Sequence, residues 1–310
     1  MTDRIVNRRF PETPCYTTLS RNVPVDDAWR PNADGVLVPD EPPEHRDHEY
    51  DPAGFAVLQD MQARHFWYQG RHRFILHALK RWLPPASGES RRGIDLGGGC
   101  GGWIGYLKKH APGQLDELAL ADSSLRALTL AAEVVGADVK RFQVDLLNLP
   151  WYERWDVAFM LDVLEHIPQD LECLKQVHRA LHPGGVLFVT TPALRCFWTY
   201  NDDLAHHVRR YSRRDFRELA IKSGFELIAA RYFMFFLSPV LLLSRLKGPD
   251  WKSMTERQIR EHLRRTHAVP AWPVNQACRL IFSLETPVGA WLPFPWGTSI
   301  LAVLRKCQES

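Results

Sequence analysis

A glycine-dense turn directly after a short apolar strand constrains this chain more than any other feature. Residues 92–102 read Arg-Gly-Ile-Asp-Leu-Gly-Gly-Gly-Cys-Gly-Gly, and a helical pattern follows them. Glycine tolerates positive φ and lets the backbone approach a ligand, so Gly97, Gly99 and Gly101 predict a tight loop whose amides face a bound cofactor. The alternating strands and helices that follow predict an α/β fold with a parallel sheet.

The residue that ends this strand helps to identify the cofactor. Gly97, Gly99 and Gly102 also satisfy the G-x-G-x-x-G spacing of dinucleotide-binding folds, in which a helix N-terminus receives a pyrophosphate. The carboxylate of Asp95 would oppose a pyrophosphate but suits a cationic amino-acid group. S-adenosylmethionine (SAM) carries a sulfonium and an ammonium and no phosphate. We therefore favour SAM and keep an NAD(P)-dependent oxidoreductase as the alternative enzyme class.

Two further strands also end at a carboxylate. Asp122 follows the apolar run 118–121, where it could accept hydrogen bonds from both ribose hydroxyls or cap the next helix, roles that are compatible. Asp145 follows Phe142-Gln-Val144, where it could accept the adenine amino group or simply cap a turn. The carboxyl ends of parallel strands meet at one edge of a sheet, so these positions predict a single cofactor crevice.

Two later blocks carry a specific family resemblance. Residues 155–168 contain D-V-L-E-H-I after a strand, and residues 181–192 contain L-x-P-G-G before the next strand. With the glycine loop, the chain resembles the class I SAM-dependent methyltransferases over about residues 90–232. The resemblance implies a Rossmann-like α/β fold: a seven-stranded, mostly parallel sheet with an antiparallel last strand at 299–305, N-terminal helices and a helical insertion before that strand.

The resemblance also implies a set of cofactor-binding residues. These are Asp95, Gly97, Gly99 and Gly101 for the methionyl part, Asp122 with Ser123 for the ribose, Asp145 and Leu146 for the adenine, and Leu161 and Asp162 for the opposite wall. Residues 65–72 are similar to an H-F-W-x-x-x-R signature found ahead of the glycine loop in this branch. An aromatic face attracts a sulfonium and an arginine can clamp a carboxylate, so Tyr68 and Arg71 join the set.

The candidate catalytic residues lie in residues 197–216, which we call the lid segment. It resembles the D-x-x-x-G-H-x-R-R-Y lid of the same branch, with His206 at the place where glycine is common. Histidine titrates near neutral pH, so His207 is a candidate general base for an oxygen or nitrogen nucleophile. His206, Arg210 and Tyr211 complete the candidate set. Alternatively, His207 only fixes the lid segment through hydrogen bonds.

A metal-assisted version of the reaction is the less favoured alternative. Asp162, Glu165 and His166 stand at i, i+3 and i+4, which would place them on one face of a helix, and His206 or His207 could complete a cluster. Certain ubiquinone-pathway and small-RNA O-methyltransferases look similar there and use a divalent cation. Metal-free relatives also carry the E-H pair, so we expect no metal.

The organisation of the chain follows from these motifs. We expect a loop-rich N-terminal extension (1–50), an N-terminal helical cap (51–88), the SAM-binding core (89–232), an apolar and helical insertion that forms a substrate pocket or interface (233–298), and the last core strand with a tail (299–310). We expect methylation of an oxygen or nitrogen atom of a small molecule, such as a natural product or a lipid- or saccharide-type acceptor. A non-catalytic SAM-binding or peripheral-membrane scaffold is the non-enzymatic alternative.

Composition limits the kinds of partner and the cellular compartment that we expect for this chain. The 310 residues are 45% hydrophobic, enough for a sizeable core, and the net charge of +3 is spread out, so no nucleic acid is expected. Six cysteines without a C-x-x-C pair favour a reducing cytoplasm. We expect no transmembrane segment, because the apolar run 232–245 is short and interrupted by Pro239. A peripheral membrane contact and a homodimer stay open.

Overall fold

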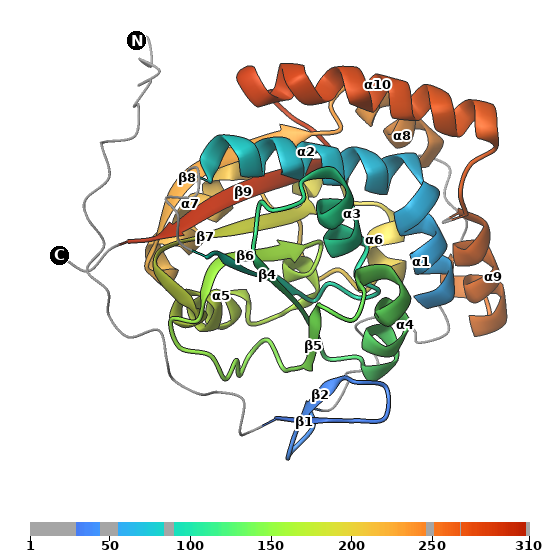
Figure 1. Ribbon diagram of the computed structural model, residues 1–310. Coiled ribbons are helices and arrows are strands. Elements are labelled where there is room, and N and C mark those ends of the chain that lie inside the picture. Colours follow the sequence, from blue (N-terminus) through green and yellow to red (C-terminus); the bar gives the residue numbers. More distant parts are fainter. Residues whose placement is uncertain (1–28, 44–54, 84–89, 246–250, 267, 308–310) are drawn as a thin grey trace, which may run out of the picture.

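Within the described residues, the protein is organised around one nine-stranded mixed sheet (Figure 1). This computed structural model describes residues 29–43, 55–83, 90–245, 251–266 and 268–307. The strands are β1 (Trp29–Pro31), β2 (Leu37–Pro39), β3 (Arg92–Leu96), β4 (Glu117–Asp122), β5 (Lys140–Gln143), β6 (Trp155–Leu161), β7 (Leu181–Pro192), β8 (Phe225–Phe233) and β9 (Ser299–Lys306).

The strand order confirms the expected fold class and contains a switch point next to β3. The order is β1-β2-β5-β4-β3-β6-β7-β9-β8. The central strands β5, β4, β3, β6 and β7 are parallel, and β9 runs antiparallel to its neighbours β7 and β8. The chain moves to one side of β3 with β4 and to the other side with β6. Sheets of this kind bind their ligands at such a switch point, so we expect the ligand site beyond the carboxyl ends of β3, β4 and β6.

Helices cover both faces of the sheet. They are α1 (Phe55–Arg64), α2 (Phe66–Trp82), α3 (Gly102–His110), α4 (Leu125–Val135), α5 (Asp170–Ala180), α6 (Tyr200–Leu204), α7 (Arg213–Ser223), α8 (Ser238–Arg245), α9 (Glu256–Thr266) and α10 (Trp272–Trp291), with 3₁₀ turns η3 (Leu164–His166), η4 (Arg195–Phe197) and η5 (Trp251–Ser253). Ile94 and Leu96 pack in the core under α5 and α7. Phe159 and Leu161 pack in the core under α2, α3 and α10.

The expectation of a loop-like stretch before residue 50 needs a correction, because β1 and β2 lie in it. They form a hairpin that extends the sheet beyond β5, which makes two strands more than the seven expected. Trp29 stacks on Trp151 with ring centroids 6.2 Å apart, and Asn32 Oδ1 accepts a hydrogen bond from the Val36 amide in the turn. Three-residue strands are too short to show an alternating pattern. Residues 1–28 and 44–50 of the expected extension lie outside the described residues.

The two expected N-terminal helices are confirmed as α1 and α2. The His65–His72 stretch forms the first turns of α2 rather than a connection between helices, and the His65 side chain caps it by accepting a hydrogen bond from the Trp67 amide. Asn275 of α10 accepts a hydrogen bond from the Phe66 amide (2.9 Å) and donates one to the Arg64 carbonyl (3.0 Å). Helix α10 therefore stabilises the turn between α1 and α2.

Helix α10 also lies very close to α2 where Gly70 faces Phe282. A Cβ atom at Gly70 would lie 1.9 Å from Phe282 Cδ1, and the Phe282 side chain is fully buried. We expect Gly70→Ala to lower the free energy of unfolding by about 1–3 kcal/mol, because overpacking outweighs the gain in helix propensity. Thermal and urea unfolding measure this. Adding Phe282→Leu should recover part of the stability that Gly70→Ala removes, whereas fully additive losses would argue against a clash.

The apolar run 232–245 divides between a strand end and a helix. Tyr232, Phe233, Met234 and Leu237 are buried, but Val240 and Leu243 on α8 are exposed. None of the helices in the described part of the chain is long and apolar enough to cross a membrane.

Candidate functional site

The glycine loop connects the carboxyl end of β3 to the start of α3. Gly97, Gly99 and Gly101 all have positive φ (71°, 56° and 75°). The Gly97 amide donates a hydrogen bond to the Ala121 carbonyl at 2.7 Å, which fixes the loop against the end of β4. The sharp backbone path follows from residues that carry no Cβ, as the sequence predicts.

Asp95 lies at the base of this loop and is almost completely buried. Its Oδ1 atom has no hydrogen-bond partner among the described residues. Burial raises the pKa of Asp95 to about 7, while the charge of Arg71 lowers it and the charge of Asp122 raises it. A buried carboxylate oxygen without a partner is costly, so this position suits a cationic ligand group.

Asp122 ends β4 as expected, Asp145 lies two residues beyond the end of β5, and backbone amides donate hydrogen bonds to both. Asp122 Oδ2 accepts a hydrogen bond from Gly99 (2.9 Å), and its Oδ1 accepts one from Ser124 (2.9 Å). Asp122 therefore joins the glycine loop to the start of α4. Asp145 Oδ1 accepts a hydrogen bond from the Leu147 amide at 2.9 Å. Ser123 and Leu146 are half-buried neighbours of the two carboxylates.

Four residues that the sequence assigns to the cofactor lie together at the carboxyl end of β6 and on α2. The buried guanidinium of Arg71 forms an ion pair with Asp162 and lies 3.4 Å from the Leu161 carbonyl oxygen. The Arg71 guanidinium also lies 5.0 Å from the ring centroid of Tyr68. Arg71 Nε is buried without a partner in the described structure. Asp162 has φ of +60°, a strained value for a non-glycine residue at a site.

Asp202 is the centre of the lid segment. Its Oδ1 atom lies 3.0 Å from His207 Nδ1 and accepts a hydrogen bond from Arg210 Nε at 2.7 Å. Arg210 Nη2 donates to the other oxygen at 3.0 Å. Burial alone would raise the pKa of Asp202, but the hydrogen bonds from His207 and Arg210 outweigh it and hold the pKa well below its usual range. Asp202 is therefore an ionised clamp that fixes both residues.

Tyr211 anchors the end of the lid segment. Its hydroxyl lies 3.0 Å from Asp170 Oδ2 and 3.3 Å from the Leu164 carbonyl oxygen. Burial, with the charge of Asp170, raises the pKa of Tyr211 well above its usual value. Asp170 also pairs with Arg209 at 2.5 Å. These contacts hold the lid segment against the η3 turn.

Glu165, His166 and His207 form a compact cluster beneath the lid segment. One ligand atom from each residue lies within 4.8 Å of the others. Both carboxylate oxygens of Glu165 are buried without a partner in the described structure, and burial followed by the charge of Asp162 raises its pKa well above its usual value. Burial, with the charges of His207 and His206, lowers the pKa of His166 to about 3. His166 is therefore neutral.

The cluster differs from the trio that the spacing predicts. Asp162 precedes η3 in a left-handed conformation and pairs with Arg71, so it does not share one helix face with Glu165 and His166. His206 is exposed and has φ of +57°. That conformation explains why glycine is common at this position of the lid pattern.

Two functional contacts were missed from the sequence. Asp202 is the first residue of the D-x-x-x-G-H-x-R-R-Y pattern, so the pattern contained the signal, but it does not say which side chains a carboxylate will hold. Asp170 stands 41 residues before Tyr211, and no local pattern joins them.

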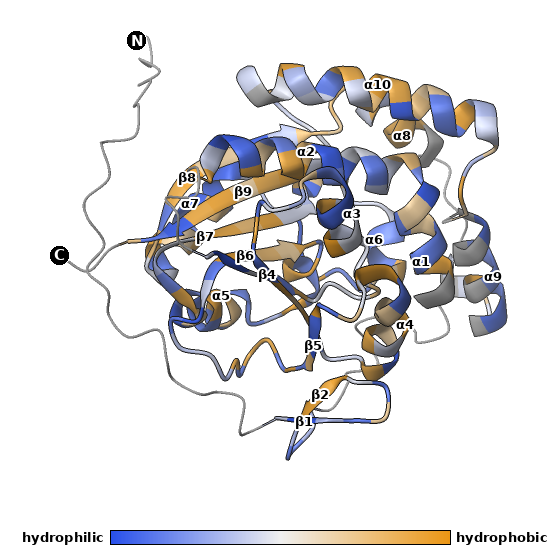
Figure 2. Ribbon diagram, in the orientation of Figure 1, coloured by the Kyte–Doolittle hydropathy of each residue, from blue (hydrophilic) through white to orange (hydrophobic). Residues whose placement is uncertain are grey.

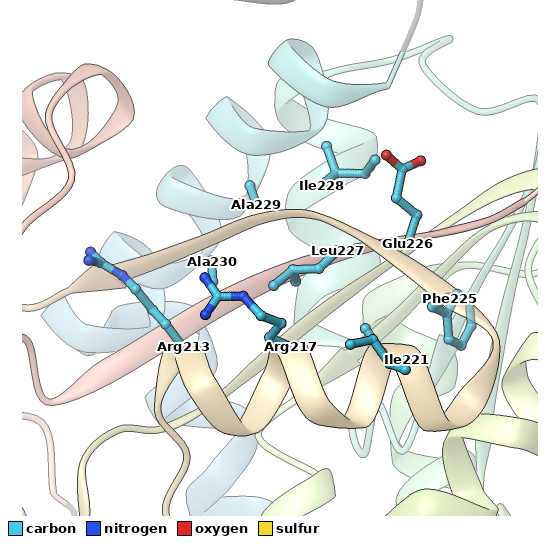
Figure 3. A pocket seen from close by; sticks show the side chains of 10 residues that line it. Arg213, Arg217, Ile221, Phe225, Glu226, Leu227, Ile228, Ala229 and Ala230 are labelled. Carbon is cyan, nitrogen blue, oxygen red and sulfur yellow. The ribbon is translucent and has the colours of Figure 1, made fainter. Parts of the chain in front are cut away.

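A shallow groove of about 490 Å³ lies elsewhere, between α7 and β8 (Figure 3). Arg213, Arg217 and Ile221 line it from the helix, and the strand contributes residues from Phe225 to Ala230. None of the residues that the sequence assigns to the cofactor lines it, and neither do Glu165, His166 or His207. The polar groups described above converge elsewhere, at the carboxyl ends of the parallel strands and at the lid segment.

Comparisons with known proteins agree with this geometry. A methyltransferase-domain family model matches residues 66–230, more than half of the chain. A ubiquinone biosynthesis O-methyltransferase of Pseudomonas aeruginosa is 24% identical over 136 residues, which are 41% of this chain and 58% of that protein. The chain thus matches less than two thirds of the length of this curated relative.

Solved structures share the fold. A phosphoethanolamine N-methyltransferase of Haemonchus contortus in complex with SAM superposes with a TM-score of 0.57 at 18% identity, over 88% of this chain and 62% of that one. The [4+2]-cyclase SpnF superposes with a TM-score of 0.54 at 16% identity, over 88% of this chain and 99% of that one. Such low identities show the fold alone, and one fold supports different reactions.

Proposed function

The chain belongs to the class I SAM-dependent methyltransferases, and from this premise we propose that it methylates an oxygen or nitrogen atom of a small molecule. The observation that supports this proposal is the Asp202–His207 pair, which stands beside the buried, unpartnered carboxylate of Glu165. An oriented histidine beside a buried polar side chain is suited to accepting a proton from a hydroxyl or an amine.

The residues at the carboxyl ends of the strands fit SAM. Asp95 offers a buried, unpartnered oxygen to the ammonium group, and the glycine loop leaves no side chains between its backbone and the ligand. The buried Nε of Arg71 suits the methionyl carboxylate. The proposed cofactor residues are Asp95, Gly97, Gly99, Gly101, Asp122, Ser123, Asp145, Leu146, Leu161, Asp162, Tyr68 and Arg71.

The proposed chemistry assigns separate roles to the lid residues. Bound SAM supplies an electrophilic methyl group on its sulfonium. Asp202 Oδ1 accepts a hydrogen bond from the N–H group at His207 Nδ1, and this leaves Nε2 free of a proton and able to take one from the acceptor. Arg210 and Tyr211 keep the lid segment in place, and we assign exposed His206 to the side from which the acceptor enters. Methyl transfer needs a nucleophile aligned opposite the departing sulfur, so positioning supplies much of the acceleration.

Oxygen is the favoured acceptor atom. The matched curated relative is an O-methyltransferase, and a hydroxyl gains more than an amine from removal of its proton by a base. The similar Haemonchus contortus structure is an N-methyltransferase, so amines belong among the acceptors to be screened.

A divalent metal at Glu165, His166 and His207 is the second candidate mechanism. One carboxylate and two imidazoles within 4.8 Å are a set that suits zinc or manganese more than magnesium, which prefers oxygen ligands. The unpartnered oxygens of Glu165 are the specific observation in its favour. A metal there would orient an acceptor hydroxyl and lower its pKa.

Labelled methyl transfer from SAM to a panel of phenols, alcohols and amines tests the proposed function. We expect His207→Gln to lower kcat about a hundredfold while SAM affinity stays unchanged, because a general base contributes to the chemical step. His77→Gln, an exposed histidine on α2, is the matched control. An unchanged kcat in His207→Gln would leave His207 with only a structural role.

The same assay separates the two mechanisms. If His207 acts as a base without metal, the wild-type rate should survive exhaustive dialysis against a chelator. If the metal mechanism holds, the rate should fall on dialysis and return with Zn²⁺ or Mn²⁺, and Glu165→Gln should abolish that recovery.

A further inference from the structure

Helix α10 presents an apolar stripe to solvent. Its inner side buries Asn275, Phe282, Glu285 and Gly289 against the rest of the protein. The opposite side exposes large apolar residues, with 62% of Leu284 and 75% of Trp291 accessible. Orange residues recur along α10 in Figure 2. The outward residues are Val274, Leu280, Ile281, Leu284, Val288 and Trp291.

Helix α8 adds to this surface. The Phe236 amide, two residues before α8, donates a hydrogen bond to Glu285 Oε2 of α10 at 3.0 Å, and Leu241 of α8 packs in the same cluster as Phe282, so the start of α8 lies against α10. The outer side of α8 exposes Val240 (65%) and Leu243 (68%). We call the outward residues of α8 and α10 together the apolar face. Soluble proteins rarely expose so many large apolar side chains on adjoining helices without a binding partner.

The exposed charged residues that the structure describes on α2, α8 and α10 are all cations. Segments 66–83, 227–245 and 268–307 contain one carboxylate residue, Glu285, and its side chain is fully buried. Arg81 lies over the Trp291 ring at 5.0 Å, and Arg279 is exposed on α10. Lys80 is exposed on α2. The apolar face is therefore bordered by cations and by no exposed carboxylate within these segments.

This combination favours a membrane over a second copy of the chain. Paired helices are usually flanked by opposite charges, whereas two copies of α10 would bring Arg279 and Arg81 toward like charges. An anionic bilayer attracts basic residues, and Trp272 and Trp291 at the two ends of α10 have the side chain that prefers the bilayer interface. We propose that the apolar face docks on an anionic lipid surface, with α10 lying in the plane of the interface.

Co-sedimentation of the full chain with vesicles tests this proposal. We expect binding to phosphatidylcholine vesicles that contain phosphatidylglycerol to be at least about tenfold stronger than binding to phosphatidylcholine alone, and to weaken with salt. The double variant Leu284→Glu, Trp291→Glu should bind at least about tenfold more weakly. Arg279→Ala should bind several-fold more weakly to the vesicles that contain phosphatidylglycerol, and its binding to phosphatidylcholine vesicles should not change.

A matched control distinguishes binding through the apolar face from non-specific binding of exposed apolar residues to vesicles. Ile221 on α7 is 74% exposed, so Ile221→Glu makes an equivalent apolar-to-acidic change elsewhere. Its binding should equal that of the wild type, and circular dichroism should show all variants folded. No pelleting of the wild type, or equal loss in Ile221→Glu, would overturn the proposal. So would a dimer in analytical ultracentrifugation that Leu284→Glu dissociates, because a second copy would then cover the face.

Discussion

Replacing Asp202 with alanine is expected to lower the free energy of unfolding by about 3–5 kcal/mol, because it leaves the buried Arg210 guanidinium without its counterion. The side chains of Asp202 and Arg210 are 1% and 5% exposed, so water cannot replace the lost contacts. His207 also loses the carboxylate that orients its ring. Methyl transfer should therefore fall along with stability. Urea unfolding at neutral pH measures the first effect, and product formation well below the melting temperature measures the second.

The stability that Asp202 contributes should depend on pH, and the direction of its pKa shift determines how. The pKa of Asp202 is lower in the folded state than in the unfolded chain, so its contribution is present above the unfolded pKa and is lost as the pH falls toward the folded pKa. The difference in stability between wild type and Asp202→Ala should shrink in acid. Glu218→Ala, which breaks an exposed pair with Arg214, is the control and should cost less than about 1 kcal/mol. A similar loss of stability in Asp202→Ala and Glu218→Ala would contradict the proposed role of Asp202 in fixing Arg210 and His207.

Asp95→Asn is expected to weaken SAM binding by about 2–5 kcal/mol, because it removes the buried charge proposed to meet the ammonium group. The ligand-free protein should become more stable near neutral pH. The folded pKa of Asp95 is raised to about 7, so its contribution to stability falls as the pH rises from the unfolded pKa toward that value. Asp95→Asn carries no titratable group at this position, so its stability should not show this fall with rising pH. Calorimetric titration with SAM and thermal unfolding across pH measure both effects.

The affinity of the wild type should also depend on pH. Since the ionised form of Asp95 is the one proposed to bind SAM, affinity should fall about tenfold from roughly pH 8 to pH 6. Asp95→Asn should remove most of that dependence. Glu133→Gln, at an exposed position on α4, is a carboxylate-to-amide control and should keep it. Full affinity in Asp95→Asn would exclude the proposed contact.

The cofactor side of the site is predictable from sequence for a simple geometric reason. Asp95 and Asp122 each stand at the carboxyl end of a parallel strand, and β3 and β4 are neighbours, so the fold brings them to one edge. The glycine spacing specifies the loop between them. The helices α1, α2 and α10 follow from apolar residues that recur at helical spacing over several turns.

The lid side is less predictable because its contacts join residues far apart in sequence. Tyr211 meets Asp170, and His207 meets Glu165 and His166, only after β7 has placed the lid segment over η3. The i, i+3, i+4 spacing also misplaced Asp162, since its backbone turns left-handed before the 3₁₀ turn begins. The strands β1 and β2 are each too short to show the alternation of apolar and polar residues that marks a strand in sequence.

The position of β9 in the sheet has a consequence for the order in which this fold can assemble on the ribosome. β9 is the last of the described strands in sequence, yet it lies between β7 and β8 and pairs with both along their lengths. A nascent chain that ends before residue 299 therefore exposes one edge of β7 and leaves β8 without a partner strand. Unpaired edges invite association with other chains. Translation that stalls in the α8–α10 region would thus release an aggregation-prone intermediate, although every strand that contributes to the proposed cofactor site had already been synthesised.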